Sequence, residues 1–230
     1  MTSAHIDTFA NDNLPPVDQQ PEFLFTLPEL QYPEQLNCAH ELLDKHVADG
    51  RGARTCLMAP ATPGASAGLH WTYAELQDKA NRIARVLVED MGLVAGNRVL
   101  LRGPNNPMLV ACWFAVMKAG GIAVTTMPLL RAKELGQIIP KGRITHALCD
   151  GRLADELKQA QAQYPILGQV RYFFDESADG LETLMAAKDG VFQNVDTAAT
   201  DTCLLAFTSG TTGEPKGTMH FHRDVMSICL

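Results

Sequence analysis

Short apolar runs alternate with longer segments that carry apolar residues at helical spacing. The runs predict buried strands at residues 98–102, 122–126, 144–149, 170–174 and 201–207. The intervening segments predict helices at residues 108–119, 131–139 and 153–163. Pro140 is expected to stop the second of these helices. Strands separated by helices of this length indicate a mostly parallel sheet covered by helices on both faces, so the predicted fold class is α/β.

The region before this alternation divides into two parts. Residues 1–35 are punctuated by prolines and predict an extended arm, with Phe23, Leu24 and Phe25 as its anchor. Residues 36–230 are predicted to form the globular part of the chain.

The globular part begins with signals for helix starts and a pair of strands. Asn37 is expected to cap a first helix, which Gly50 ends. Two short strands are predicted at residues 55–58 and 69–71. The next helix has a clear start, because Thr72 and Glu75, three residues apart, form the sequence pattern of a capping box.

The last third of the chain leaves the alternating pattern and then returns to it. Residues 175–201 are polar and predict a surface excursion with a short helical piece around Leu184. A loop from Thr208 to Gly217 follows the last buried strand, and a helix is expected to start near His222. Its apolar periodicity continues to Leu230 with no glycine, proline or basic turn to end it, so we expect the sequence to be truncated.

Composition narrows the class of protein. Of the 230 residues, 46% are hydrophobic and 20% are charged, and the net charge is −7 without a basic cluster, which argues against nucleic acid as a partner. The six cysteines are scattered without a CxxC pair, so their spacing suggests neither a zinc site nor a disulfide framework. The start of the chain lacks the pattern of a secretory signal, and no apolar stretch reaches the roughly 20 residues of a membrane span. We therefore expect a cytoplasmic protein.

The loop from Thr208 to Gly217 has the composition of a phosphate-binding loop. Its sequence, TSGTTGEPKG, combines glycines that let backbone N–H groups approach an anion with hydroxyl donors and one lysine. It follows a buried strand, where open α/β sheets place ligands. It is not a Walker A loop, because Lys216 is preceded by proline and followed by glycine, and a Rossmann fingerprint is absent. The alternative is a solvated glycine-rich turn with an exposed lysine.

Residues 205–216, LAFTSGTTGEPK, resemble position by position the signature of the acyl-adenylate-forming (AMP-binding) superfamily. This superfamily includes acyl-CoA synthetases, luciferases and the adenylation domains of peptide synthetases. The resemblance extends to residues 71–76, 103–106 and 118–121, and so covers most of residues 36–230. Within the superfamily, two further segments look most like benzoate and 2-aminobenzoate CoA ligases, at residues 125–135 and 146–150.

The resemblance implies the amino-terminal part of an ATP-dependent carboxylate:CoA ligase. In such enzymes the carboxylate attacks the α-phosphorus of Mg²⁺-bound ATP, and the thiol of CoA then displaces AMP from the acyl-adenylate. ATP, Mg²⁺, CoA and an aromatic acid are the implied ligands. Residues 36–230 would be an incomplete AMP-binding domain, whose downstream core and small C-terminal domain carry the adenine, Mg²⁺ and adenylation-lysine sites. We therefore expect the 230-residue chain alone to be inactive, and its oligomeric state stays open.

The same resemblance assigns roles to individual residues. The β- and γ-phosphates would be held by Thr208, Ser209, Gly210, Thr211, Thr212 and Gly213. Lys216 would add positive charge at the pyrophosphate. His222 falls where the family often has a histidine, and it would orient the substrate carboxylate. The alternative for His222 is a histidine at a helix N-terminus that hydrogen-bonds the backbone, while His220 is expected to be structural.

Two other functions stay open. The chain could belong to an adenylation domain that loads a carrier protein instead of CoA, or it could be a non-catalytic nucleotide-binding protein that ends at Leu230. Reading the gene beyond codon 230 would separate these alternatives. The acidic residues Asp175, Glu176 and Asp179 are expected to form a solvated turn, because their spacing does not match a Ca²⁺ loop.

Overall fold

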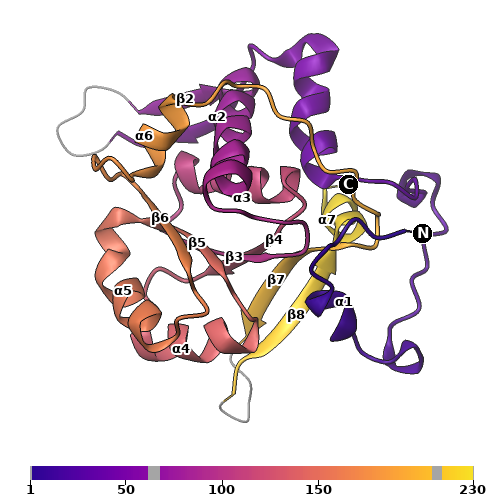
Figure 1. Ribbon diagram of the computed structural model, residues 1–230. Helices are drawn as coiled ribbons and strands as arrows, with labels where there is room; N and C mark the ends of the chain where they lie inside the picture. Colours follow the sequence, from indigo (N-terminus) through magenta and orange to yellow (C-terminus); the bar gives the residue numbers. More distant parts are fainter. Residues whose placement is uncertain (1, 62–67, 209–213, 230) are drawn as a thin grey trace.

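The centre of the computed structural model, which describes residues 2–61, 68–208 and 214–229, is a six-stranded sheet (Figure 1). The strand order is β6-β5-β3-β4-β7-β8. Neighbouring strands from β6 to β7 are parallel, and β8 is antiparallel to β7. The strands are β3 (Arg98–Arg102), β4 (Ile122–Thr126), β5 (His146–Asp150), β6 (Gln169–Phe173), β7 (Thr202–Thr208) and β8 (Lys216–Phe221). The predicted α/β class with a mostly parallel sheet is confirmed.

Helices cover both faces of this sheet. In Figure 1, α2 (Tyr73–Arg85) and α3 (Pro107–Lys118) lie above it, and α4 (Ala132–Lys141) and α5 (Ala154–Gln163) lie below it. Successive strand residues point to opposite faces. Leu101 accordingly belongs to the apolar cluster under α2 and α3, whereas Leu100 belongs to the cluster against α4 and α5. Both faces are therefore apolar, which explains why the strands appear in the sequence as continuous hydrophobic runs.

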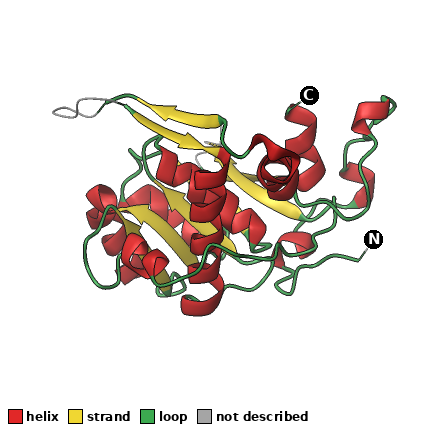
Figure 2. Ribbon diagram, turned by 90° about the horizontal axis from the view of Figure 1, so that it is seen from above, coloured by secondary structure: helices red, strands yellow, loops and turns green. Residues whose placement is uncertain are grey.

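Shorter elements surround these layers. β1 (Thr55–Ala59) and β2 (Leu69–Thr72) pair as a separate antiparallel ribbon, which extends away from the main sheet (Figure 2). The other helical elements are α1 (Phe9–Asp12), α6 (Leu181–Ala186), α7 (His222–Ile228), π-helical segments at His40–Asp44, Val47–Arg51 and Val86–Asp90, and 3₁₀ turns at Val17–Gln19, Pro28–Leu30 and Gly151–Leu153. Among the described residues, no helix is both long and apolar enough to cross a bilayer.

The helix starts predicted from capping residues are confirmed. The Thr72 hydroxyl accepts a hydrogen bond from the Glu75 N–H at 3.2 Å, and the Glu75 carboxylate accepts one from the Thr72 N–H at 2.7 Å. Asn37 Oδ1 likewise accepts from the Ala39 N–H at 3.0 Å where the first helical segment begins. These signals are reliable because both partners lie within three residues of each other.

Two local predictions are wrong. Residues 216–221, expected to be part of a loop and a connection, form the edge strand β8. One half of this strand is exposed and the other half is partly buried, so its sequence shows no alternation that would reveal it. Pro140 does not stop α4, which continues to Lys141. It lies in the last turn, where its missing N–H removes only one helical hydrogen bond, and Gly142 N still donates to the Ile138 carbonyl at 2.8 Å.

Two of the contacts that join the amino-terminal arm to the globular part involve the arginines Arg98 and Arg223. Asp7 accepts a hydrogen bond from Arg98 Nη1 at 2.6 Å, and the side chain of Arg98 is 2% exposed. Further along, the Arg223 guanidinium lies 4.3 Å from the ring centroid of Phe23 and also contacts the ring of Phe25. Leu24 is 70% exposed, so it does not act as an anchor. In an extended backbone its side chain points away from the side on which its two neighbours pack.

Asp7→Asn is expected to lower the free energy of unfolding by about 1–2 kcal/mol at neutral pH, because the buried Arg98 loses its charged partner. Burial opposes ionisation of Asp7, but hydrogen bonds, chiefly from Arg98, hold its pKa below the usual value of 3.8. A lowered folded-state pKa gives stability that is present above 3.8 and disappears as the pH falls through the folded value. Denaturant unfolding at several pH values should show the difference from wild type shrinking in acid. An equal difference at all pH values would contradict this assignment.

Candidate functional site

The predicted phosphate-binding loop lies between two paired strands. Thr208 is the last residue of β7 and Lys216 the first residue of β8, and the two are directly opposite each other in the antiparallel pair. Both residues are exposed. The hairpin thus brings a hydroxyl and an ammonium group, eight positions apart in the sequence, to the same end of the sheet. The other predicted phosphate ligands, Ser209, Gly210, Thr211, Thr212 and Gly213, lie outside the described residues.

Gly217 explains how β8 can pack against β7 directly after the loop. A Cβ atom at this position would lie 3.0 Å from Leu205 Cδ1 and 3.4 Å from Phe207 Cε1. Any larger residue would have to push these two side chains aside. The glycine that follows Lys216 therefore has a packing role as well as a place in the motif.

The two described ends of the loop, Thr208 and Lys216, lie at the carboxyl-terminal edge of the parallel strands. Ala123 of β4 pairs with Leu204 of β7, and Thr126 at the end of β4 pairs with Arg102 at the end of β3. The carboxyl ends of β3, β4 and β7 therefore point to the same edge. Open α/β sheets bind ligands at this edge, and both described ends of the loop lie there, so the nucleotide site stays a prediction with which the fold is compatible.

The structure does not bring His222 to the loop. It follows β8 at the end opposite Lys216, about 20 Å along the strand at roughly 3.3 Å per residue. Its side chain is fully buried, and Nδ1 accepts a hydrogen bond from the Cys38 N–H at 3.1 Å. The backbone hydrogen bond of the alternative assignment is therefore present. A role for His222 in orienting the substrate carboxylate stays a prediction, which this arrangement does not support.

The surroundings of His222 contain two thiols that sequence spacing could not connect. Cys38 Sγ lies 3.2 Å from His222 Nδ1. A hydrogen bond from Cys203 is the largest influence on Cys38 and, against the effect of burial, lowers the pKa of the Cys38 thiol to about 6. Burial and the neighbouring Cys38 raise the pKa of Cys203. The three residues come from distant parts of the sequence, so the signal for this cluster is spatial.

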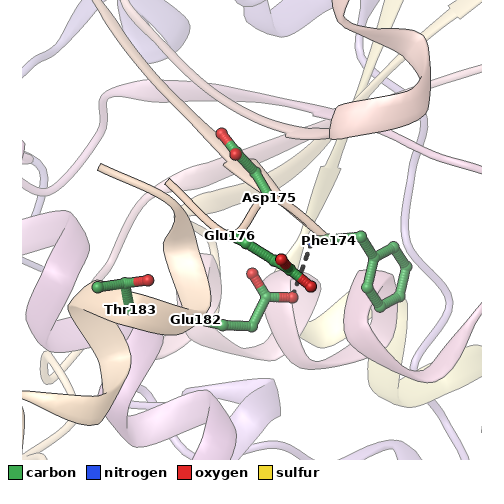
Figure 3. A pocket seen from close by; sticks show the side chains of 5 residues that line it. All are labelled: Phe174, Asp175, Glu176, Glu182 and Thr183. Carbon is green, nitrogen blue, oxygen red and sulfur yellow. Dashed lines mark hydrogen bonds between the residues drawn. The ribbon is translucent and has the colours of Figure 1, made fainter. Parts of the chain in front are cut away.

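A pocket of about 560 Å³ lies beside the turn that follows β6 (Figure 3). Asp175, Glu176 and Glu182 line it, together with Phe174 and Thr183. Glu182 Oε1 accepts a hydrogen bond from the Phe174 N–H at 2.9 Å, drawn as the dashed line in Figure 3. Asp175 accepts hydrogen bonds from the N–H and the hydroxyl of Ser177, both at 3.0 Å. These bonds give Glu182 and Asp175 structural roles in the turn, and the negative charge of the three carboxylates disfavours a phosphate ligand.

A second pocket, of about 360 Å³, lies at the carboxyl ends of β3, β4 and β5. Its charged lining consists of Arg102, Arg131, Arg152, Asp155 and Glu156. Arg102 is 1% exposed, and its Nη1 has no hydrogen-bond partner within the described parts of the chain. Burial lowers its pKa, because the charged guanidinium is poorly solvated there. The sequence identified Arg102 only as the end of a strand, and the charges of both signs around it favour no single class of ligand.

Comparison with known protein families identifies the family of the chain. Residues 44–230 match the model of a family described as AMP-binding enzyme. The chain belongs to this family.

Three individual proteins show which members of the family the chain is similar to. The chain is 25% identical to the benzoate--CoA ligase of Thauera aromatica, over 87% of this chain and 37% of that protein. It is 27% identical to the 3-hydroxybenzoate--CoA/4-hydroxybenzoate--CoA ligase of the same organism, over 86% of this chain and 37% of that protein. The crystal structure of the anthranilate CoA ligase AuaEII in complex with anthranoyl-AMP has the same fold, with a TM-score of 0.75, 22% identity, and coverage of 86% of this chain and 37% of the other. The chain thus spans about 37% of the length of these relatives.

Proposed function

We propose that the chain is the amino-terminal part of an ATP-dependent ligase that joins a carboxylic acid to CoA. The pairing of Thr208 with Lys216 at the carboxyl edge of the sheet carries the proposal, in a chain that belongs to the AMP-binding family. The loop between them contains glycines and hydroxyl residues, which can surround a triphosphate with backbone and side-chain donors. The relatives named as CoA ligases support CoA as the acyl acceptor.

The proposed reaction uses Mg²⁺-bound ATP as a substrate. An oxygen of the carboxylate attacks the α-phosphorus, pyrophosphate leaves, and the thiol of CoA then displaces AMP from the acyl-adenylate. In this scheme residues 208–213 hold the β- and γ-phosphates, and Lys216 neutralises charge on the departing pyrophosphate. The work of this part of the chain is positioning and charge compensation, since none of these groups forms a covalent bond to the substrate.

An aromatic acid is the proposed substrate. The names of the two Thauera aromatica relatives, at 25% and 27% identity, support a benzoate or a substituted benzoate. The segments at residues 125–135 and 146–150 resemble this branch. The first spans the end of β4, the connection to α4 and the start of that helix, and the second is the strand β5.

AMP formation by the full-length gene product tests this proposal. Benzoate and 2-aminobenzoate are expected to give acid-dependent AMP and the corresponding acyl-CoA, and a fatty acid of eight to ten carbons to give at least about 10-fold less. The 230-residue chain, assayed beside it, should form no AMP. If the adenylate forms without acyl-CoA and the acyl group passes to a carrier protein, the acyl acceptor is that carrier protein and not CoA. Absence of AMP with every acid would refute ligase activity.

A further inference from the structure

Three side chains that are good ligands for soft metal ions meet in the interior of the molecule. Cys38 Sγ, Cys203 Sγ and a ring nitrogen of His222 all lie within 4.8 Å of one another, and all three residues are buried. Cys38 lies at the start of the first helical segment, Cys203 is on β7, and His222 is the first residue of α7. The fold therefore assembles two thiols and an imidazole from three separate elements.

A further sulfur atom, which is also a soft metal ligand, lies next to these three side chains. The Met117 thioether lies 3.2 Å from Cys38 Sγ. Thiolate, thioether and imidazole ligands favour thiophilic ions such as Zn²⁺ and Cu⁺ over Mg²⁺ or Ca²⁺, which prefer oxygen. Tetrahedral Zn²⁺ with sulfur at about 2.3 Å and nitrogen at about 2.0 Å places its ligand atoms roughly 3.5–4 Å apart. The separation of 3.2 Å between Cys38 Sγ and His222 Nδ1 is within a few tenths of an ångström of this requirement.

The hydrogen bonding of the imidazole indicates which ring nitrogen can bind a metal. His222 Nδ1 accepts the hydrogen bond from the Cys38 N–H, so this nitrogen carries a lone pair and the ring proton is assigned to Nε2. Nε2 is buried and has no hydrogen-bond partner among the residues that the structure describes. The nitrogen that lies against the Cys38 thiol is thus the one with the free lone pair, as metal binding demands.

We propose that Cys38, Cys203 and His222 form a structural binding site for one Zn²⁺ ion. The ion would bind both sulfurs as thiolates and His222 through Nδ1, and the two thiol protons would be released to solvent. The hydrogen bond from the Cys38 N–H to Nδ1 would be exchanged for the metal–nitrogen bond. Bound Zn²⁺ would link the first helical segment to β7 and α7, so it would stabilise the packing of the amino-terminal region on the edge of the sheet.

Zinc titration of the purified, chelator-treated and reduced protein tests the site. All proteins carry Cys229→Ser, because Cys229 is an exposed thiol that could bind metal independently. In competition with a chromophoric chelator, one equivalent of Zn²⁺ should bind. Cys38→Ala and Cys203→Ala should each weaken binding by at least about 10-fold. Cys149→Ala is the matched control, since Cys149 is buried on the opposite face of the sheet, and it should bind Zn²⁺ as the parent does.

Two further readouts keep the test decisive if an alanine variant folds poorly. Co²⁺ added to the parent protein should give thiolate-to-cobalt charge-transfer absorption, and Zn²⁺ should raise its melting temperature in a concentration-dependent manner. Equal Zn²⁺ affinity in the parent and both cysteine variants would overturn the proposal. So would a Co²⁺ complex without charge-transfer bands, or a parent protein that binds no Zn²⁺.

Discussion

Asp44→Ala is expected to lower the free energy of unfolding by about 3–5 kcal/mol, because it leaves a buried ammonium group without its counter-ion. The side chain of Lys118 is 1% exposed, and its Nζ donates to Asp44 Oδ1. The same carboxylate accepts hydrogen bonds from Gln77 at 2.7 Å and from Asn194 at 2.6 Å. One substitution therefore removes the acceptor shared by three donors that come from different elements.

The loss should depend on pH in a defined direction. Burial lowers the pKa of Lys118 from 10.5, and Asp44 opposes this shift. Without Asp44 the folded-state pKa falls further, so the folded variant can release the Lys118 proton at a lower pH than the unfolded chain does. Its stability then rises with pH between the folded value and 10.5, and the difference from wild type should shrink in this window. Urea unfolding at pH 7 and pH 9.5 measures the effect.

Two control variants separate the buried pair from surface charges. Glu41→Ala removes the partner of Lys45 in an i,i+4 pair whose lysine is 54% exposed, and it should cost only about 0.3–0.5 kcal/mol. Lys118→Met removes the buried charge and leaves Asp44 bound to Gln77 and Asn194, so it should cost less than Asp44→Ala. A loss below about 1 kcal/mol for Asp44→Ala would show that Lys118 finds solvent or another partner in the folded protein.

The sequence was sufficient for elements whose signals are local. The sequence predicts the strands Arg98–Arg102 and Ile122–Thr126 at their observed bounds, because all of the first strand and the first three residues of the second are buried, which gives each a continuous apolar run. The capping box at Thr72 and Glu75 needs only two residues three positions apart. Strand β8 was missed, because an edge strand is held by its pairing with β7 and needs no apolar alternation of its own.

The residues of the candidate site also fall into two groups: those that a local motif identifies and those that only the tertiary fold brings together. The loop and Lys216 were recognised from a contiguous motif, and the hairpin explains their proximity to Thr208. The motif could not show that β8 carries His222 away from the loop, since this depends on the length and direction of an unrecognised strand. The cluster of Cys38, Cys203 and His222 was likewise invisible, because its members are up to 184 residues apart and meet only through the tertiary fold.

Lys216→Ala in the full-length gene product is expected to reduce the rate of carboxylate-dependent pyrophosphate release by about 10²–10³-fold. The residue is exposed at the start of β8 opposite Thr208, next to the loop that we propose holds the phosphates of ATP. A charge that acts mainly on the departing pyrophosphate stabilises the transition state more than bound ATP. We therefore expect kcat to fall more than the KM for ATP rises. Pyrophosphate release at saturating acid, with ATP varied, provides both values.

The comparison with other lysine variants decides whether this effect is specific. Lys133→Ala removes an exposed lysine from α4 and should leave pyrophosphate release unchanged, which controls for the loss of one positive surface charge. Lys216→Arg keeps the charge but changes the geometry of its donors, so it should recover part of the rate. Neither Lys216→Ala nor Lys216→Arg should alter the melting temperature, because Lys216 is exposed at the start of an edge strand. If Lys216→Ala released pyrophosphate at the wild-type rate, the lysine would have no role in adenylation. Phosphate binding would then depend on the hydroxyl and backbone donors of the loop alone.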